Sequence, residues 1–223
     1  MKHISKNKFK LKLNSNFVLK RILDICLSIV FIFIFFFPMV LISIFVKINS
    51  NGTVLFWSKR IGKDDRTFNM PKFRTMKDDT PIVSSEKIIK PELYFTKYGK
   101  FLRRFSLDEL PQIYNIIKGE MSFVGPRPNV EREVKLYTEE EMKILRMRPG
   151  ITDISSIVFS DEGDILDNSI DPDLDYNQLI RPGKNLLGLF YIEKSNVFLD
   201  IYLCLLTIVA IISKRTALLL INK

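Results

Sequence analysis

The sequence predicts an α/β domain that is mostly helical, has few short strands and is docked on a membrane. Three observations lead to this prediction: one long apolar segment near the N-terminus, two later segments with a helical pattern, and only two short segments with a strand pattern. We expect a basic tail over residues 1–21, a membrane helix over residues 22–46 and one compact domain over residues 47–223.

The N-terminal apolar segment is expected to enter the membrane and leave it by the same face. Residues 1–21 contain seven lysines and arginines and no acid, and Asp24 is the single charge in Ile22–Val46. Hydropathy alone favours a plain span, because this segment is long enough to cross a bilayer. However, Pro38 removes a backbone donor and favours a bend, and both flanks are basic, which favours the cytoplasm for both. The sequence therefore predicts a re-entrant helix broken near Pro38, with a plain span as the alternative.

Short elements are expected after the membrane helix. Strand patterns cover Val54–Ser58 and Phe68–Met76, and helical patterns cover Leu107–Lys118 and residues 129–146. Residues 161–175 carry seven acids and no base. Glycine and proline interrupt this acidic segment and no ligand spacing repeats, so it predicts a solvated loop rather than a metal site.

A second apolar segment lies near the C-terminus. Val197–Ile212 is interrupted by Asp200 and is short for a membrane span. It predicts either a helix that lies in the membrane interface or a core helix of the domain.

Composition limits the classes of chemistry. The formal net charge is +9, which suits nucleic acid, anionic lipid or a phosphorylated substrate. Six of the 18 phenylalanines lie in the apolar segment 22–46 instead of alternating with basic residues elsewhere, so nucleic-acid binding is not expected. The single histidine, His3, is near the N-terminus, and Cys26 and Cys204 lie in apolar runs. A Ser-His-Asp or Cys-His nucleophile and a His-ligated zinc site are therefore excluded, which leaves carboxylates, lysines, tyrosines and hydroxyls.

The segment Ser106–Glu109 has the pattern of a helix start. Ser106 can act as the N-cap, and Glu109, three residues later, completes a capping box. Asp108 then lies in the first turn, where the helix dipole favours its ionised form. This tetrapeptide by itself predicts a helix terminus and no particular chemistry.

The cations near this segment predict a phosphate site. They are Arg103 and Arg104 just upstream, Arg127 between two prolines, and Lys72 and Arg74 in a Lys-Phe-Arg-Thr-Met segment. Taken singly, each cation is equally well explained by an ion pair with a surface acid. Cations that converge on a helix N-terminus, however, favour anions together with the free N–H groups. A carboxylate in such a site can hold Mg²⁺ on a diphosphate or attack phosphorus.

Five motifs resemble one protein family in both order and spacing. The motifs are Lys72–Met76 (KFRTM), Leu102–Arg103 with Ser106–Gln112 (SLDELPQ), Lys118–Ser122 (KGEMS), Gly125–Pro128 (GPRP) and Arg148–Thr152 (RPGIT). Together they are similar to the bacterial sugar transferase family, the monotopic polyprenol-phosphate phosphoglycosyl transferases. The resemblance runs from about Lys20 to the C-terminus.

This resemblance implies a catalytic Asp108–Glu109 dyad in residues 47–223. Asp108 would attack the β-phosphate of a UDP-sugar, release UMP and hold the phosphosugar covalently until polyprenyl (undecaprenyl) phosphate accepts it. Glu109 would be the main ligand of Mg²⁺ or Mn²⁺. Arg103 and Arg127 match positions expected near the substrate phosphates, and Lys72 matches a further basic position.

The resemblance also implies a location and a pathway. The enzyme would be bound to membrane lipids of the inner membrane, with its catalytic domain on the cytoplasmic face and the re-entrant helix broken near Pro38. Its product would enter the synthesis of exopolysaccharide, lipopolysaccharide or capsule. Because the chain begins with the basic tail, it resembles the minimal form of the family. Neither the sugar nor the oligomeric state is predicted.

Two positions depart from the family pattern. Asp153 stands where many members have glycine after the Arg-Pro-Gly-Ile-Thr motif, and Ser160 stands where a phosphate-contacting arginine is expected. Two alternatives to the family function are a membrane-anchored module that binds anionic lipid and a glycosyl transferase that moves the sugar without its phosphate. The first would release no nucleotide from a UDP-sugar, and the second would release UDP instead of UMP.

Overall fold

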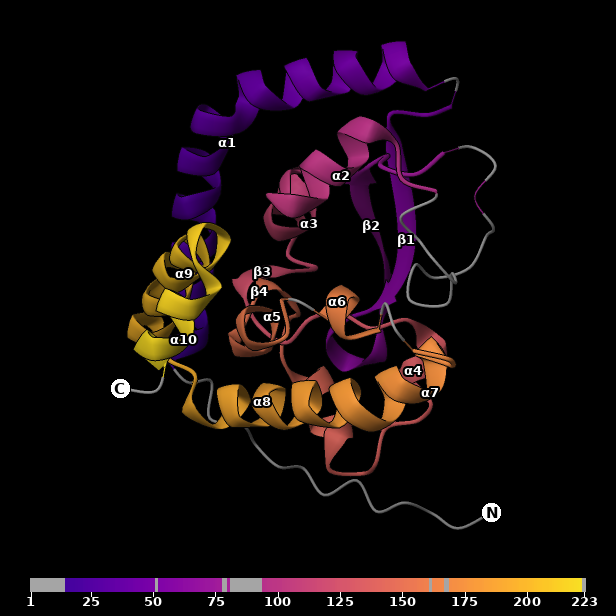
Figure 1. Cartoon of the computed structure of the whole chain (residues 1–223). Helices are drawn as coiled ribbons and strands as arrows, with labels where there is room; N and C mark the ends of the chain where they lie inside the picture. Colours follow the sequence, from indigo (N-terminus) through magenta and orange to yellow (C-terminus); the bar gives the residue numbers. More distant parts are fainter. Residues whose placement is uncertain are drawn as a thin grey trace.

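The computed structural model of the chain describes residues 15–50, 52–77, 80, 94–160, 162–166 and 169–221. His3 and most of the basic tail lie outside this part, as does a portion of the acidic segment 161–175. The described part is mostly helical with few short strands, as predicted (Figure 1).

The chain folds into many short elements after one long helix. The α-helices are α1 (Ser15–Asn49), α2 (Lys97–Arg104), α3 (Ile113–Lys118), α4 (Glu131–Val134), α5 (Ile154–Val158), α6 (Glu162–Leu166), α7 (Pro172–Asp175), α8 (Arg181–Lys194), α9 (Val197–Ile212) and α10 (Lys214–Ile221). The strands are β1 (Leu55–Ile61), β2 (Thr67–Phe73), β3 (Ser122–Val124) and β4 (Gly150–Thr152). In the described part of the chain, the order is completed by the 3₁₀-helices η1 (Lys63–Asp65), η4 (Leu107–Gln112) and η5 (Glu141–Arg146) and by a π-helical segment, η6 (Tyr176–Ile180).

Helix α1 contains the whole of the predicted membrane segment. By length and composition, residues Phe17–Asn49 suffice to cross a membrane, and most of their side chains face outward. Figure 1 shows that α1 is bent, with one part beside α9 and α10 and the other running past α2 and α3. Pro38 lies inside this helix, and its role in the bend remains a prediction.

The described strands form two small sheets. β1 and β2 form an antiparallel pair in which Trp57 is opposite Pro71, and β3 and β4 form a parallel pair. Both predicted strand segments overlap β1 and β2. Pro71 is tolerated because each strand of a two-stranded sheet has a free edge where the missing N–H is not needed.

The predicted helix over Leu107–Lys118 is divided in two. Its first half is the 3₁₀-helix η4, and its second half is α3. Pro111 is the second-last residue of η4 and cannot donate an intrahelical hydrogen bond, which favours the division. Gly119 then ends α3 in the left-handed conformation, with φ of 84°.

The prediction of one continuous helix over residues 129–146 is wrong. The chain forms α4 and η5 with a break between them. Thr138 and Glu141 form a capping box at the break: the Glu141 carboxylate accepts the Thr138 N–H at 2.8 Å, and the Thr138 hydroxyl accepts the Glu141 N–H at 3.2 Å. This pair satisfies free N–H groups and starts a new helical segment.

The acidic segment is not simply a loop. It contains α6 and α7, because Leu166 is buried against Tyr176 and Ile180 and this apolar contact orders the chain. Within the described residues, no cluster of three or more acidic, histidine or cysteine side chains is placed to hold a metal ion.

Helix α9 combines both alternatives for the C-terminal apolar segment. Leu203 and Leu206 are buried in the main core with Tyr191, whereas Phe198 and Ile212 are more than four-fifths exposed. One face therefore belongs to the core, and the opposite face presents apolar side chains outward. Figure 1 shows α9 beside one part of α1.

Candidate functional site

The two acids of the predicted dyad lie on η4, which follows α2 and packs against β2. The capping box predicted for Ser106 and Glu109 is wrong. Ser106 has a left-handed backbone with φ of 55° and forms no side-chain cap. The Glu109 carboxylate is engaged elsewhere, with cations from distant segments. A left-handed conformation is unfavourable for serine, and such strain is typical of functional sites.

Glu109 binds two cations. Its Oε1 accepts hydrogen bonds from Lys72 Nζ at 2.7 Å and from Arg127 Nη2, and its Oε2 accepts one from Arg127 Nη1 at 3.3 Å. Burial alone would raise the pKa of this carboxyl, but the charges of Arg127 and Lys72 outweigh burial and hold the pKa well below its ordinary value. Glu109 is therefore ionised throughout the physiological pH range.

Lys72 reaches the site from β2, 37 positions before Glu109 in the chain. Burial lowers the pKa of Lys72, and the Arg127 charge lowers it further, whereas Glu109 and Asp108 act in the opposite direction. The pKa of the Arg127 guanidinium shifts in the opposite direction to that of Lys72, because the Glu109 charge raises it above the ordinary value.

The loop that carries Arg127 is held in place by its backbone. The Gly125 N–H donates to the Thr152 carbonyl at 3.0 Å, and the Ile61 N–H donates to the Asn129 carbonyl at 2.9 Å. A Cβ atom at Gly125 would lie 2.5 Å from the Arg148 carbonyl oxygen, so only glycine fits there. Prolines on both sides of Arg127 restrict the chain further.

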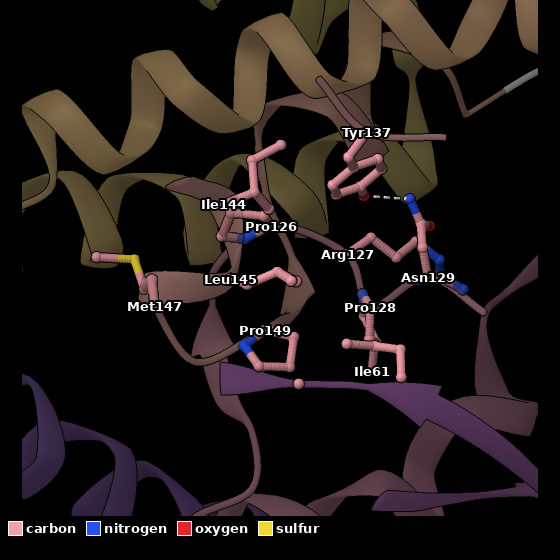
Figure 2. Close-up of a pocket in the computed structure, with 11 residues that line it drawn as sticks. Ile61, Pro126, Arg127, Pro128, Asn129, Tyr137, Ile144, Leu145, Met147 and Pro149 are labelled. Atoms are coloured by element: carbon pink, nitrogen blue, oxygen red, sulfur yellow. Dashed lines mark hydrogen bonds between the residues drawn. The ribbon is translucent and has the colours of Figure 1, made fainter. Parts of the chain in front are cut away.

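A small pocket lies behind this loop (Figure 2). Pro126, Ile144 and Leu145 contribute apolar walls, and Asn129 Nδ2 donates to the Tyr137 hydroxyl at 2.7 Å. Its volume of about 10 Å³ is close to that of a single water site. The pocket therefore supports the packing of the loop and is too small for a nucleotide-sugar.

Asp108 differs sharply from its neighbour. Its side chain is buried, at 6% exposure, and its carboxylate forms no hydrogen bond or ion pair with the part of the chain that the structure describes. Burial raises the pKa of Asp108, and the Glu109 charge raises it further, although Lys72, Arg103 and Arg127 counteract the shift. The expectation that the helix dipole governs this carboxyl is therefore wrong, because desolvation dominates.

The remaining predicted cations lie around this cluster at different places. Arg103 is exposed, stacks over the Phe95 ring at 4.6 Å and acts on Asp108 through its charge. Arg104 lies instead over the Phe105 ring. Arg74 donates to the Thr53 hydroxyl at 2.9 Å, near the start of β1. The structure thus joins Lys72, Glu109 and Arg127 directly, places Arg103 at the edge, and directs Arg74 to another contact.

Two acids that the sequence analysis did not assign to the phosphate site also influence Arg127. The charges of Glu162 and Asp153 both act on its guanidinium, and Glu162 is itself paired with Lys184 of α8. Asp153 caps α5 by accepting the Ser156 N–H at 2.6 Å, which gives it a local role at its departure from the family pattern. No local sequence signal joins Glu162 to Lys184, because they come from different helices.

Asp108 and Glu109 are two carboxylates, fewer than the cluster of three that is lacking in the described part of the chain, so they could hold a magnesium ion only together with phosphate oxygens of a ligand. Mg²⁺ commonly binds one or two carboxylates and completes its shell with phosphate oxygens and water. The Asp108 oxygens have no hydrogen-bond partner in the described part of the chain, whereas both Glu109 oxygens accept bonds from cations. Glu109 would therefore exchange at least one of these bonds in order to bind the ion.

A family model described as bacterial sugar transferase matches residues 15–214, which is nearly the whole chain. The chain belongs to the bacterial sugar transferase family. This confirms the resemblance derived from the five motifs. The buried Asp108 and the cation-bound Glu109 lie in one of these motifs, and the proline-flanked Arg127 lies in another.

Several curated proteins are similar to this chain. The undecaprenyl-phosphate glucose phosphotransferase of Komagataeibacter xylinus is 32% identical over 205 residues, which are 89% of this chain and 36% of that protein. The exopolysaccharide production protein ExoY of Rhizobium meliloti is 39% identical over 153 residues, covering 62% of this chain and 68% of ExoY. An N-acetylgalactosaminephosphotransferase of Aeromonas hydrophila, which is named for UDP-N-acetylgalactosamine and undecaprenyl phosphate, is 28% identical over 87% of this chain and 44% of its own length. The chain thus spans less than half of two of these relatives.

Proposed function

We propose that this chain transfers a sugar 1-phosphate from a UDP-sugar to undecaprenyl phosphate or a similar polyprenyl phosphate and releases UMP. One observation carries the proposal: a buried Asp108 carboxylate without a hydrogen-bond partner in the described residues lies next to a Glu109 that holds two cations. The names of the relatives from Komagataeibacter and Aeromonas support the acceptor and the transfer of a sugar phosphate. The product would begin the assembly of a surface glycan.

In the first step, an Asp108 oxygen attacks the β-phosphorus of the UDP-sugar. A bond forms between this oxygen and phosphorus, and the bond from phosphorus to the bridging oxygen breaks. The bridging oxygen leaves with UMP, and the phosphosugar remains on Asp108 as an acyl phosphate. The charges of Lys72 and Arg127 act on Asp108 and would stabilise the negative charge that develops on the phosphate oxygens.

In the second step, a phosphate oxygen of the polyprenyl phosphate attacks the same phosphorus. The acyl–phosphate bond breaks and returns the Asp108 carboxylate, and the product is a polyprenyl diphosphate sugar. Because the nucleotide has already left, one anionic site serves two anionic substrates in turn. The order of events predicts ping-pong kinetics.

We propose Mg²⁺ or Mn²⁺ as the cofactor. Glu109 would be the main ligand of the ion, which supplies positive charge to the diphosphate when bound, and Asp108 would remain the nucleophile. Full turnover in excess EDTA would contradict this proposal.

We further propose that α1 is re-entrant, with the domain on the cytoplasmic face. Near its start, Arg21 donates to the Ile116 carbonyl at 2.6 Å, and near its end Val46 is buried against Phe73 and Leu102. A straight helix of this length would exceed the roughly 30 Å hydrocarbon core. Both ends of α1 contact the same domain, whereas a plain span would place these two ends on opposite sides of the membrane. Cysteine labelling that locates the N-terminus and residue 60 on opposite faces would contradict re-entry.

The decisive test of the reaction is a nucleotide-release assay with a panel of UDP-sugars. We expect UMP to form before polyprenyl phosphate is added, and the trapped enzyme to gain the mass of one phosphosugar on a peptide containing Ser106–Gln112. Release of UDP would indicate an ordinary glycosyl transferase, and release of no nucleotide from any sugar would indicate a lipid-binding module. An adduct on another peptide would remove Asp108 from the role of nucleophile.

A further inference from the structure

Two buried side chains near the start of α1 bind the strand that leads to Arg127. Lys20 and Asp24 are four residues apart, so they lie on the same face of the helix. They are buried, at 9% and 2% exposure. Both contact β3, which begins 98 positions after Asp24 in the chain. The helix predicted to enter the membrane is therefore joined by polar contacts to a strand close to the site.

Asp24 binds two adjacent residues of β3. Its Oδ1 accepts the Ser122 hydroxyl at 2.9 Å and the Phe123 N–H at 3.1 Å. In the described part of the chain, β3 pairs with β4 alone, so the backbone groups on its other edge need different partners. The Asp24 carboxylate thus supplies at Phe123 the acceptor that a neighbouring strand would supply.

Lys20 binds the last residue of β3. Its Nζ donates to the Val124 carbonyl at 2.8 Å, and also to Asp200 Oδ2 at 2.7 Å and to the Tyr191 hydroxyl at 3.1 Å. The lysine thereby uses all three of its N–H groups. These groups are buried, and a buried polar group that loses its partner is costly, so the arrangement resists displacement. Together, Lys20 and Asp24 hold every residue of β3.

Little freedom remains between β3 and Arg127. Gly125 and Pro126 are the two residues that separate them. The Gly125 N–H donates to the Thr152 carbonyl at 3.0 Å, and the Pro126 carbonyl accepts the Gly150 N–H at 3.1 Å. The proline ring also fixes its own φ. A displacement of β3 would therefore be transmitted to the Arg127 guanidinium instead of being absorbed by the loop.

We propose that Lys20 and Asp24 are positioning residues for Arg127. They act through β3, which they hold where the guanidinium pairs with Glu109 and, in the proposed reaction, meets the substrate phosphates. Small misplacements of such a group reduce the rate strongly. Helix α1 is then part of the framework of the site as well as a membrane anchor. The kinetic consequence rests on the proposed function, but the hold on Arg127 can be measured without turnover.

Arg21 offers a matched control beside Lys20 in α1. Its guanidinium donates to the Ile116 and Ile117 carbonyls at 2.6 and 2.8 Å, at the end of α3. Arg21→Met therefore also weakens the attachment of α1 to the domain, but it leaves the side-chain contacts with β3 in place. If α1 only stabilised the fold, Arg21→Met and Asp24→Ala would have similar effects on Arg127.

The first measurement is the rate at which phenylglyoxal modifies Arg127 in the full-length protein in detergent, followed by peptide mass spectrometry. This reagent attacks guanidinium groups, and a guanidinium held in an ion pair reacts slowly. We expect Asp24→Ala to raise the rate at Arg127 at least about threefold, and Arg21→Met to leave it within about twofold. Arg181, which is partly buried on α8, is the internal reference for loosening of the whole domain.

Ser122→Ala is the milder second variant, because it removes one of the two hydrogen bonds between Asp24 and β3. It should raise the Arg127 rate in the same direction while the Arg181 rate stays constant. An unchanged Arg127 rate in both Asp24→Ala and Ser122→Ala would overturn the proposal. So would equal rises at Arg127 and Arg181 in both variants, because α1 would then only stabilise the domain.

The second measurement is a double-mutant cycle in steady-state kinetics. Asp24→Ala should lower kcat at least about tenfold with little change in KM, but less than about threefold in the Arg127→Lys background, where the positioned group is already lost. Arg21→Met should act by the same factor in both backgrounds. Equal factors for Asp24→Ala in the two backgrounds would assign Asp24 a merely structural role. If the wild type released no UMP, the proposed function would fail, and the modification rates alone would decide whether Asp24 positions Arg127.

Discussion

Arg127 and Glu109 form a two-pronged ion pair in which each carboxylate oxygen accepts a bond from a different guanidinium nitrogen. Lys72 adds a third bond to the same carboxylate. Asp108, the adjacent residue, has no such partner among the described residues and is buried. Neighbouring acids thus have pKa values displaced in opposite directions, as expected for a pair with different roles.

Replacing Asp108 with Asn should abolish turnover and stabilise the fold at neutral pH. The folded-state pKa of Asp108 is raised, so its ionisation opposes folding, and stability decreases as pH rises through that pKa. A neutral Asn at position 108 does not ionise, so the variant does not lose this stability as the pH rises. Thermal unfolding at several pH values should therefore show that the advantage of Asp108→Asn appears only above the ordinary pKa of aspartate. An Asn variant that turns over at near wild-type rate would end the nucleophile proposal.

Replacing Glu109 with Gln should destabilise the protein by about 2–3 kcal/mol, because Lys72 and Arg127 would keep their charges without their partner. This exceeds the ~1 kcal/mol expected for loss of a helix cap. In the wild type the folded-state pKa of Glu109 is lowered, so this stabilisation is present above the ordinary glutamate pKa and lost as pH falls further.

Chemical denaturation gives the measurement, with Glu140→Gln as the control for Glu109→Gln. Glu140 pairs with Lys143 at an exposed position, so its loss should change the unfolding free energy by less than about 1 kcal/mol. If the two variants lowered the unfolding free energy equally, the ion pairs of Glu109 would contribute no more to stability than an exposed ion pair.

Replacing Arg127 with Lys should lower kcat/KM at least tenfold, since lysine keeps the charge and loses the planar two-pronged contact. Arg103→Lys should have a smaller effect, because Arg103 is exposed at the edge of the cluster. Arg104→Lys is the matched control, as its guanidinium lies over Phe105. Wild-type steady-state kinetics in Arg127→Lys would assign this arginine a structural role.

Replacing Ser106 with Ala should change stability by less than about 0.5 kcal/mol, because the Ser106 side chain forms no cap. Ser106→Gly should stabilise by removing the strain of φ at 55°, and Ser106→Val should destabilise by about 1–2 kcal/mol. Thr138→Ala, which removes a formed capping box, should cost about 1 kcal/mol. If Ser106→Ala cost as much as Thr138→Ala, the serine would be a cap after all.

Replacing Asp200 with Asn should destabilise the fold by about 3–5 kcal/mol. Lys20 Nζ donates to Asp200 at 2.7 Å, both side chains are buried, and the Tyr191 hydroxyl donates to the same carboxylate. The double variant Lys20→Met/Asp200→Leu should recover most of this loss, because it removes both charges together. A double variant as unstable as Asp200→Asn would show that packing, not the buried charge, sets the cost.

Local patterns were sufficient for part of this fold. The strand segments of β1 and β2 and the end of a helix at Gly119 follow from residues that are close in sequence. The division of the predicted helix over Leu107–Lys118 was not predicted, although Pro111 favours it. The division of residues 129–146 was missed although Thr138 and Glu141 have the spacing of a capping box. The equally spaced Ser106 and Glu109 form none. The same spacing therefore gives a capping box at Thr138 and none at Ser106. The reason is that Glu109 pairs with distant cations, whose positions cannot be predicted from neighbouring residues.

By itself, the sequence determined the family, the adjacent acids, the cations near them and the apolar membrane helix, since these depend on residue types and short spacings. Only the tertiary structure decided that Lys72 and Arg127 meet on Glu109 and leave Asp108 without such a partner. It also decided that Arg74 binds Thr53 instead of joining them. The physical reason is that desolvation and ion pairing depend on which distant elements pack together. Packing of β2, η4 and the Arg127 loop buries both carboxyl groups, which raises the pKa of Asp108. It also brings the charges of Lys72 and Arg127 to Glu109, which lowers the pKa of that carboxyl, and the spacing of Asp108 and Glu109 carries no information about this packing.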